Sequence, residues 1–383
     1  DDGEWTIIQC DSARTGGGHI SPDRWAVDLN DSLLTRGYMI EYYFSAVDNA
    51  GLVSTLPLGG GGAGAGPSLA TAPAKMFEFT CLPTGKSPLL YVDDFHGRGC
   101  HEGVVELYFN QVFEHVNDPE NQPDRYDVNS PSSLVSNGLG GRAKLNHIIW
   151  DNVQHKGYCG IIWDSGNLDV GTITDGLCGN DKSNDAQLLV DWLDQSDHWP
   201  GLWISGDAIA SELDASPTPQ AAELLSVWGG VQLSSDSYFD LTGGRYSGGV
   251  VNPLVMGTAE GLFGTSLQFH VFGGCPTING FDVLEPTGSG IAALAYPDYG
   301  GSPYYAAVQS ETMNSMGATA RVLWFGFSFM YIRDIEAQAP IVRNVLFSDV
   351  KHWLGFGISN SDITEDDISK TYKLSQNFPN PFN

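Results

Sequence analysis

The chain has 383 residues, of which 42% are apolar and 11% aromatic, and this is enough to fill the cores of two or three globular domains. It carries 46 acidic and 18 basic residues, which excludes nucleic acid and anionic membrane surfaces as expected partners, because both are bound through clustered Lys and Arg. No apolar run approaches the roughly 18 residues of a membrane-spanning helix, so no membrane span is expected.

The first 57 residues predict a small β domain. Apolar and polar residues alternate, as is typical of strands, in Trp5–Cys10, Trp25–Leu29 and Met39–Val47. The segment from Glu41 to Gly51 resembles the penultimate strand of fibronectin-III-like or immunoglobulin-like modules in bacterial exported proteins. A stretch of this length is too short for the roughly seven strands of such a module. We therefore expect a partial β-sandwich over residues 1–57.

A linker is expected next. The run Gly59–Gly66 consists of Gly and Ala, and such a stretch is flexible because it cannot bury side chains. We place a linker and lead-in at 58–86 and the main domain at 87–357.

From residue 87 onward, short apolar strands alternate with segments of helical periodicity. Strands are expected at Leu89–Val92, Tyr126–Val128, Cys159–Trp163 and Leu202–Ile204. Helices are expected at Val104–Val116, Leu145–Val153, Ala186–Leu193 and Ala221–Trp228. Strands that alternate with helices are typical of a parallel sheet covered on both faces. The predicted fold class is α/β, with a doubly wound, mostly parallel sheet.

A β-rich insertion interrupts this pattern. Residues 231–300 contain many Gly, Ser and Asp with short alternating stretches between them. The doubly wound pattern resumes with strands at Tyr304–Gln309 and Ala320–Phe327 and a helix at Ile341–Leu354.

The stretch Gly201–Leu213 passes from a strand into a helix through the corner Ser205-Gly206-Asp207. Corners of this kind lie at the carboxyl edge of a parallel sheet, where open sheets bind ligands. Ser205 is a weak candidate nucleophile, since the elbow of a hydrolase has Gly two residues before and after the Ser. Here those positions are Trp203 and Asp207, and the nearest His in the sequence is His198. A corner or helix-cap role is favoured for Ser205 and Asp207.

The order of elements from Leu89 to Phe356 resembles the class I glutamine-amidotransferase-like, flavodoxin-related fold of bacterial exported proteins. The resemblance implies a Cys on the elbow of active members, followed later by a His and a Glu. The elbow of this chain has Ser205, and the late segment Trp324–Phe329 has neither His nor Glu. The resemblance therefore supports the fold and counts against that reaction, and we expect no enzyme of this type.

Acidic residues follow three of the predicted parallel strands. Asp94, next to Asp93, follows the first strand, Asp164 the third and Asp207 the fourth, and the ends of these strands meet at one edge of the sheet. With His96 they form a candidate site for Ca²⁺ or Mg²⁺. The favoured alternative is that each Asp caps the helix that follows it.

Two other groups extend the cation hypothesis. The loop after the first strand adds His101 and Glu102. A second, weaker calcium candidate is the set Asn180, Asp181, Asn184 and Asp185, whose spacing fits no EF-hand. No other cofactor is indicated.

The six cysteines form no C-x-x-C pair, which argues against a zinc ribbon or a redox site of the thioredoxin type. An even number in an exported protein favours disulfides. Cys159 with Cys178 closes the shortest loop and is the predicted pair.

The chain ends with an acidic spacer, Ser359–Lys370, and the string Leu-Ser-Gln-Asn-Phe-Pro-Asn-Pro-Phe-Asn at 374–383. This string resembles the start of the C-terminal sorting domain of the bacterial type IX secretion system, which we place at 358–383 with its spacer. The resemblance implies the type IX secretion machinery as a partner and an extracellular or cell-surface location. The alternative is a proline-rich turn at a loose terminus.

These features predict an exported, non-catalytic surface or matrix protein that serves as a binding or assembly module. Open strand edges of a partial sandwich favour self-assembly. One alternative is a secreted peptide or glycan hydrolase that uses the acidic carboxyl edge. Another is a cation-dependent glycan adhesin, for which the loop Tyr296–Tyr305 is the candidate stacking surface, although most Trp and Tyr residues are expected in the core.

Overall fold

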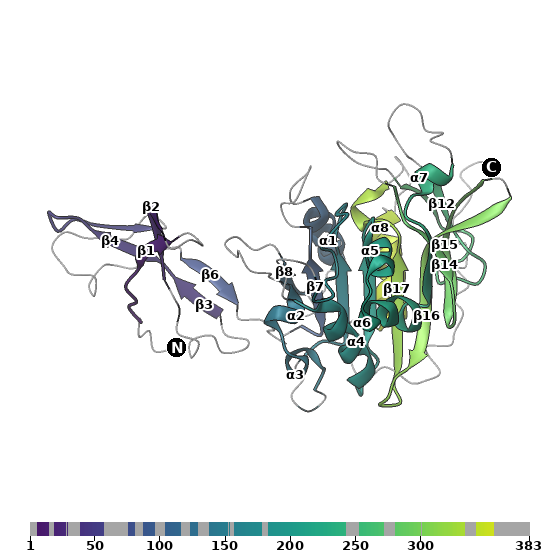
Figure 1. Cartoon of the computed structure of the whole chain (residues 1–383), viewed down its shortest axis with the longest axis horizontal. Helices are drawn as coiled ribbons and strands as arrows, with labels where there is room; N and C mark the ends of the chain where they lie inside the picture. The colour runs from purple at the N-terminus through teal and green to yellow at the C-terminus, as the bar shows by residue number, and fades with distance from the viewer. Residues whose placement is uncertain are drawn as a thin grey trace, which may run out of the picture. The chain divides into compact units, whose positions relative to one another are not determined.

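The computed structural model describes residues 6–14, 19–27, 29, 39–56, 76–80, 87–95, 104–115, 123–128, 138–151, 153, 157–177, 183–242, 253–271, 280–299, 301–333 and 342–355. The chain divides into two compact units, Asp1–Thr84 and Gly85–Asn383, which Figure 1 draws with their labelled elements. The predicted linker run Gly59–Gly66 and the predicted sorting segment 358–383 lie outside the described residues.

The first unit consists, in its described part, of antiparallel strand pairs. The pairs are β1 (Asp11–Arg14) with β2 (Ile20–Ala26), β3 (Met39–Tyr42) with β6 (Phe77–Thr80), and β4 (Phe44–Val47) with β5 (Val53–Leu56). The predicted strand Met39–Val47 is thus present as two strands, β3 and β4, with different partners. β6 lies inside the segment predicted as linker and lead-in, so part of 58–86 is a strand.

This unit buries little of its described surface. Tyr42, Phe44 and Phe77 form an aromatic cluster with ring centroids 5.3 to 6.3 Å apart, yet Phe44 is 42% exposed and Leu56 54%. Among the residues of the unit whose side chains the structure describes, only Thr55 is buried. Strand pairs without a shared core are marginally stable in water.

The second unit is built on one large sheet, whose strand order is β18-β13-β12-β15-β16-β17-β10-β9-β7-β8. Five neighbouring strands are parallel to one another: β8 (Asp124–Asp127), β7 (Leu89–Asp93), β9 (Gly160–Asp164), β10 (Gly201–Ser205) and β17 (Thr319–Phe325). Residues of β7, β9 and β10 are buried along their whole length, because helices cover both faces of this half. The predicted α/β class with a parallel sheet is confirmed in this half.

The other half of the sheet is antiparallel. Its strands are β11 (Val231–Ser235), β12 (Leu254–Gly257), β13 (Gln268–Val271), β14 (Val283–Pro286), β15 (Gly290–Tyr299), β16 (Ser302–Met313) and β18 (Ile332–Arg333). The segment 231–300, predicted as a β-rich insertion, therefore extends the same sheet. The predicted strand Tyr304–Gln309 lies within β16, which is antiparallel to both β15 and β17.

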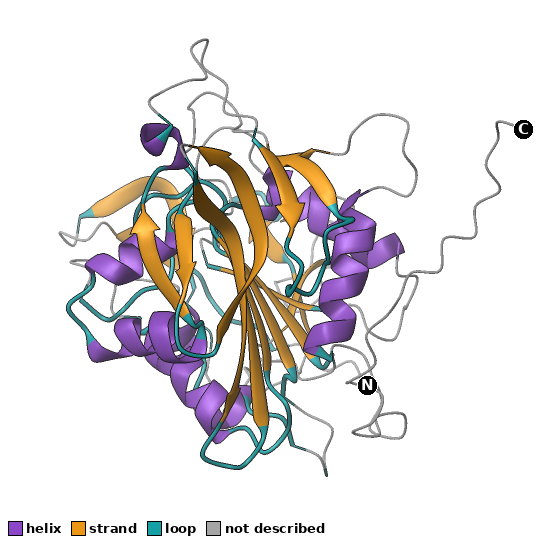
Figure 2. Ribbon diagram, turned by 90° about the vertical axis from the view of Figure 1, so that its right-hand side faces the viewer, coloured by secondary structure: helices purple, strands orange, loops and turns teal. Residues whose placement is uncertain are grey.

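Helices flank the sheet on both sides, as Figure 2 shows. One face carries α1 (Val104–His115) and α8 (Val342–Leu354). The other carries α4 (Asp185–Gln195), α5 (Ile209–Ala215), α6 (Pro219–Ala222) and the π-helix η3 (Glu223–Trp228). The short helices α2 (Leu139–Arg142) and α3 (Leu145–Ile148) contact α4. α7 (Tyr238–Leu241) follows β11, and a 3₁₀ turn, η4 (Phe329–Tyr331), precedes β18.

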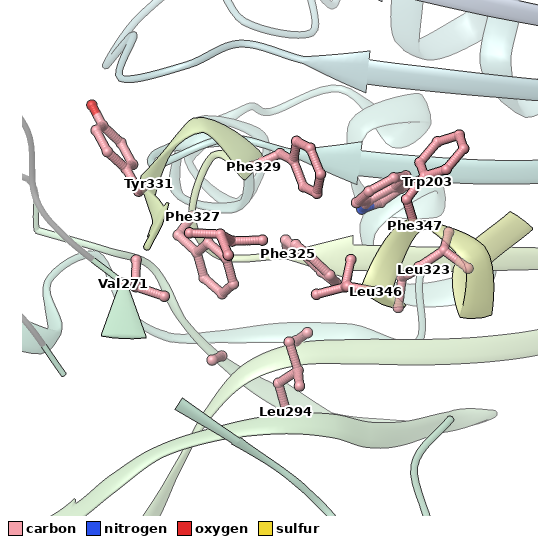
Figure 3. Packing of buried hydrophobic residues seen from close by; sticks show 14 of the residues in the cluster. Trp203, Val271, Leu294, Leu323, Phe325, Phe327, Phe329, Tyr331, Leu346 and Phe347 are labelled. Carbon is pink, nitrogen blue, oxygen red and sulfur yellow. The ribbon is translucent and has the colours of Figure 1, made fainter. Parts of the chain in front are cut away.

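Trp203, in the middle of β10, lies among buried aromatic side chains, which include the labelled Phe325, Phe329 and Phe347 in Figure 3. Its ring centroid is 5.3 Å from that of Phe329, 5.4 Å from Phe325 and 6.2 Å from Phe347. Trp203 is fully buried. This core packs the parallel strands against η4, so that η4 lies at the carboxyl ends of those strands.

No helix in the described part of the chain has the length and apolar character needed to cross a membrane.

The predicted disulfide between Cys159 and Cys178 is wrong, because Cys159 carries a free thiol. Cys159 is buried immediately before β9, and burial raises the pKa of its thiol to about 12. Cys10 is also free, and the other cysteines lie outside the described residues.

Candidate functional site at the carboxyl edge of the sheet

The parallel strands end in one row. Asp93 on β7, Asp164 on β9, Ser205 on β10 and Phe325 on β17 are register partners in that order. The residues that follow them, including Asp94 and Asp207, lie along the same carboxyl edge, as the topology of a parallel sheet requires. This is the edge at which the sequence places the candidate site.

Asp164 is fully buried, and its carboxylate oxygens accept several hydrogen bonds. Oδ1 accepts from the Ser328 hydroxyl and the Gly166 N–H, both at 2.8 Å, and Oδ2 accepts from the Phe329 N–H at 3.2 Å. Burial raises the pKa of Asp164 to about 7, although the hydrogen bonds to its charged form lower it. The carboxylate therefore connects β9 to the segment after β17.

The Ser205 hydroxyl likewise connects its strand, β10, to the segment after β17. It accepts a hydrogen bond from the Phe329 N–H at 2.7 Å and donates one to the Phe327 carbonyl at 3.2 Å, and it is fully buried. A serine nucleophile must give its proton to a base. Here the hydroxyl faces the Phe327 carbonyl and also hydrogen-bonds to the Asp164 carboxyl, and Ser205 and Asp164 are both fully buried. His198 precedes β10 at its amino end, among the rings of Trp150 and Trp199. A strand of five residues, about 17 Å long, separates it from Ser205.

Asp94 and Asp93 also bond within the protein. Asp94 accepts from the Ser165 hydroxyl at 2.8 Å, and that hydroxyl accepts from the Trp163 indole N–H at 3.2 Å. Asp93 accepts from the Phe95 N–H at 3.1 Å. Both Asp residues are buried. Asp94 holds the turn after β7 against the turn after β9, whereas the Asp93 bond lies within the turn after β7.

Asp207 holds a strained residue. Its Oδ1 accepts a 2.7 Å hydrogen bond from the N–H of Phe281, which has φ +60° and is the only non-glycine residue in the described part of the chain with positive φ. This conformation is unfavourable for a bulky side chain. Phe281 is fully buried, so packing and the Asp207 bond together keep it in place.

Asp282 is the site residue that the sequence did not reveal. Its Oδ2 accepts hydrogen bonds from the N–H groups of Ala210 at 2.9 Å and Ser211 at 3.1 Å, in the first turn of α5. The Ncap residue of α5, Ala208, makes no side-chain cap bond. The prediction that Asp207 caps α5 is therefore wrong, because the cap comes from a residue of the antiparallel half. No local pattern around Asp282 signals this role, since the two partners are 72 residues apart.

The second oxygen of Asp282, Oδ1, is buried and has no hydrogen-bond partner. Burial, followed by the charge of Asp207, raises the pKa of Asp282 well above its usual range. Burial and the nearby charge of Asp169 likewise raise the pKa of Asp207 to about 7, against the hydrogen bond from Phe281. Desolvation thus acts on both carboxyls, and it favours their protonated forms.

A metal site is not assembled by the described residues, among which no three His, Cys, Asp or Glu side chains lie close enough to hold an ion. His96, His101 and Glu102 lie outside the described residues, as do Asn180 and Asp181. The prediction of a Ca²⁺ or Mg²⁺ site at Asp94, Asp164, Asp207 and His96 therefore stays a prediction.

Asn184 and Asp185, the two described residues of the second calcium candidate, form hydrogen bonds within the protein. Asp185 accepts from the hydroxyls of Ser183 and Thr174 and from the Gly140 N–H. Asn184 caps α4 by accepting from the Gln187 N–H at 2.9 Å.

The aromatic residues that suggested glycan stacking are mostly buried, as expected of a core. Trp163, Trp192 and Trp203 have no exposed surface. Tyr296, in the predicted stacking loop, is 2% exposed and stacks on Tyr238 with centroids 4.6 Å apart. Its hydroxyl donates to the Asp282 carbonyl at 3.3 Å.

No protein-family model matches the sequence, and no curated protein is similar to it. Solved structures with a distant similarity include the following two. The first is described as the mmIFT52 N-terminal domain, with a TM-score of 0.39 and 10% identity over 72% of this chain and 99% of that one. The second is a putative ThuA-like protein from Bacteroides uniformis ATCC 8492, with a TM-score of 0.37 and 9% identity over 70% of this chain and 92% of that one. Both TM-scores are below 0.5, so neither likeness assigns a fold or a function to this chain.

Proposed function

We propose that the chain is an exported, non-catalytic protein whose α/β unit serves as a binding or assembly module. The observation that supports this most is the closure of the carboxyl edge by the chain's own backbone. The segment from Phe327 to Phe329 forms hydrogen bonds with the side chains of Ser205 and Asp164, which are fully buried.

Catalysis at this edge requires a reactive group within hydrogen-bond reach of a substrate. Ser205 hydrogen-bonds to the Phe327 carbonyl, the Phe329 N–H and the Asp164 carboxyl, and it has no exposed surface for a substrate to reach. The bulk of Phe329 is itself in the core, stacked on Phe109 at 4.6 Å. Opening the edge would break these hydrogen bonds and, at the same time, remove the Phe329 ring from the core.

The catalytic part of the proposal is tested by substitution. Asp207 is the least buried of the three candidate aspartates, with 9% exposure. Purified protein and its Asp207→Ala variant are screened for turnover of peptide and glycan substrates. Asp214→Ala is the control, because Asp214 is an exposed aspartate of α5, the helix that follows Asp207. We expect no turnover by any of the three. Turnover that Asp207→Ala abolishes and Asp214→Ala retains would overturn the proposal.

Export and assembly are tested separately. The sorting string at 374–383 supports export, and its deletion is expected to retain the protein inside cells that have the type IX machinery. The exposed apolar strands of the first unit, such as Phe44 and Leu56, support self-assembly. Mass in solution, measured by analytical ultracentrifugation, is expected to exceed that of one chain. A monomer without a surface partner would count heavily against an assembly role.

A secreted hydrolase is the second candidate, and one observation favours it. The pKa values of both Asp164 and Asp207 are raised by burial to about 7, as is common for a general acid. The same substrate screen decides between the two candidates.

A further inference from the structure

A cavity of about 230 Å³ lies away from the carboxyl-edge network, between the loop that follows β9 and the end of α5. Its apolar lining includes Ile173 and Leu213, each 1% exposed, and Leu177, which is 61% exposed. The acidic side chains of Asp175 and Glu212 also line it. Apolar and acidic groups thus face the same small space.

Hydrogen bonds hold the two acidic side chains in place. Glu212 accepts from the N–H groups of Gly171 at 2.6 Å and Thr172 at 2.8 Å, and from the Thr172 hydroxyl at 2.6 Å. Asp175 accepts from the Leu177 N–H at 2.8 Å and from the Ser216 hydroxyl. The carboxylates therefore tie the loop to α5, and the site is largely formed before any ligand binds.

Both carboxylates keep acceptor capacity. A carboxylate offers about four acceptor positions, of which the bonds above use three on Glu212 and two on Asp175. The described residues that line the cavity include no Lys, Arg or His. Its charge is therefore negative, and it favours a cation over an anion or a neutral group.

The size of the cavity limits the ligand. Pockets for cofactors and drug-sized molecules usually have volumes of about 300 to 1,000 Å³, and this cavity is smaller. A single long side chain is the appropriate size. Lys and Arg combine an apolar stem with a charged head, which matches the apolar lining beside the two carboxylates.

We propose that this cavity binds one basic side chain of a partner protein, with the stem against Leu177 and Pro217, which are exposed apolar residues of the lining, and the charged head at Asp175 and Glu212. Arginine is preferred to lysine because its guanidinium is weakly hydrated and presents a planar fork of donors to carboxylates. The inference depends on the proposed binding role, because it names the chemistry of the partner that this role requires.

The test uses the full chain and a defined probe. N-acetyl-arginine methylamide is titrated into the protein while the methyl NMR signals of Leu177, at the surface of the cavity, and Leu213, at its base, are followed, and the neutral citrulline analogue serves as the matched ligand control. We expect saturable shifts at both methyl positions with the arginine probe. Binding of the citrulline probe should be weaker by about tenfold or more, because it lacks the charge.

Three variants locate the binding. Asp175→Asn removes one charge but keeps both hydrogen bonds, since the Ser216 hydroxyl can accept as well as donate, and it should weaken binding several-fold. Ala215→Trp fills the cavity from its wall and should abolish the shifts. Asp214→Asn makes the same charge change on α5 outside the lining, and it should leave binding unchanged.

Equal binding of the two probes, or equal weakening by Asp214→Asn and Asp175→Asn, would overturn the proposal, as would an absence of saturable shifts. If Ala215→Trp does not fold, the ligand pair and the two Asp variants still decide. Any of these failures leaves the proposed non-catalytic role intact, because the substrate screen tests that role independently.

Discussion

At the start of α5, Asp282 supplies the hydrogen-bond acceptor that the helix's own Ncap residue, Ala208, does not. The first N–H groups of a helix need an acceptor from outside the helix. Here the acceptor comes from the residue before β14, and the neighbouring Phe281 is kept in its strained conformation by Asp207. Two Asp side chains thus join the parallel half of the sheet to the antiparallel half.

Removal of the Asp282 carboxyl should therefore destabilise the fold. Asp282→Ala leaves the N–H groups of Ala210 and Ser211 without their acceptor, and we expect a loss of about 2 kcal/mol in the free energy of unfolding. Asp282→Asn should cost less than about 1 kcal/mol, because its amide oxygen can still accept and burial already favours the neutral form of the group. Urea denaturation of both variants measures the difference. Equal losses would contradict the cap assignment.

The buried carboxyls also predict an unusual pH dependence. The pKa values of Asp164 and Asp207 are about 7 in the folded protein and about 4 in an unfolded chain. The folded state therefore binds protons more tightly, and this contribution to stability is fully present below about pH 4 and is lost as the pH rises through 7. Each unit of pKa shift corresponds to about 1.4 kcal/mol.

We expect the free energy of unfolding to be higher at pH 5 than at pH 8, which urea titrations at the two values would measure. In Asp164→Asn the difference should shrink, because the amide does not titrate. Asp214→Asn, at an exposed position of α5, is the control and should leave the difference unchanged. Higher stability at pH 8 than at pH 5 in the unmodified protein would contradict the expected direction.

At the scale of elements, α1 shows how a helical stripe connects the sheet to the closed edge. Phe109, on its buried face, has ring centroids 4.7 Å from Tyr91, 5.7 Å from Trp203 and 4.6 Å from Phe329. The helix thus contacts two central strands and η4 through a single residue. Leu107, on the same helix, is 51% exposed.

These two positions form a matched pair. Phe109→Ala creates a cavity in the core and should lower the free energy of unfolding by about 3 to 5 kcal/mol. Leu107→Ala removes an exposed side chain and should change it by less than about 0.5 kcal/mol. Chemical denaturation of the two variants tests the pair, and similar losses at both positions would refute the assigned orientation of α1.

At the scale of the whole molecule, the two units differ in how much they bury. The second contains the continuous aromatic and aliphatic core around Trp203 (Figure 3), whereas the described part of the first has only Thr55 buried. A unit with its own core is expected to fold on its own.

A fragment that begins at Gly85 should therefore keep the main thermal transition of the full chain. We expect its Tm to lie within about 3 °C of the full-length value, since little buried surface is lost with residues 1–84. Differential scanning calorimetry of both proteins checks this. A much lower Tm for the fragment would show that the first unit stabilises the second.

The sequence by itself determined the parallel half of the sheet, including β7, β9 and β10, and it placed Asp94, Asp164 and Asp207 at one edge. These predictions depend on apolar periodicity and on the succession of elements along the chain, both of which can be read from neighbouring residues. Only the tertiary structure decided the antiparallel direction of β16, the cap from Asp282 and the closure of Ser205 by Phe329. The direction of β16 depends on its pairing with β15 and β17. The cap and the closure depend on contacts between residues 72 and 124 positions apart, and no pattern of neighbouring residues encodes which distant backbone will supply a partner.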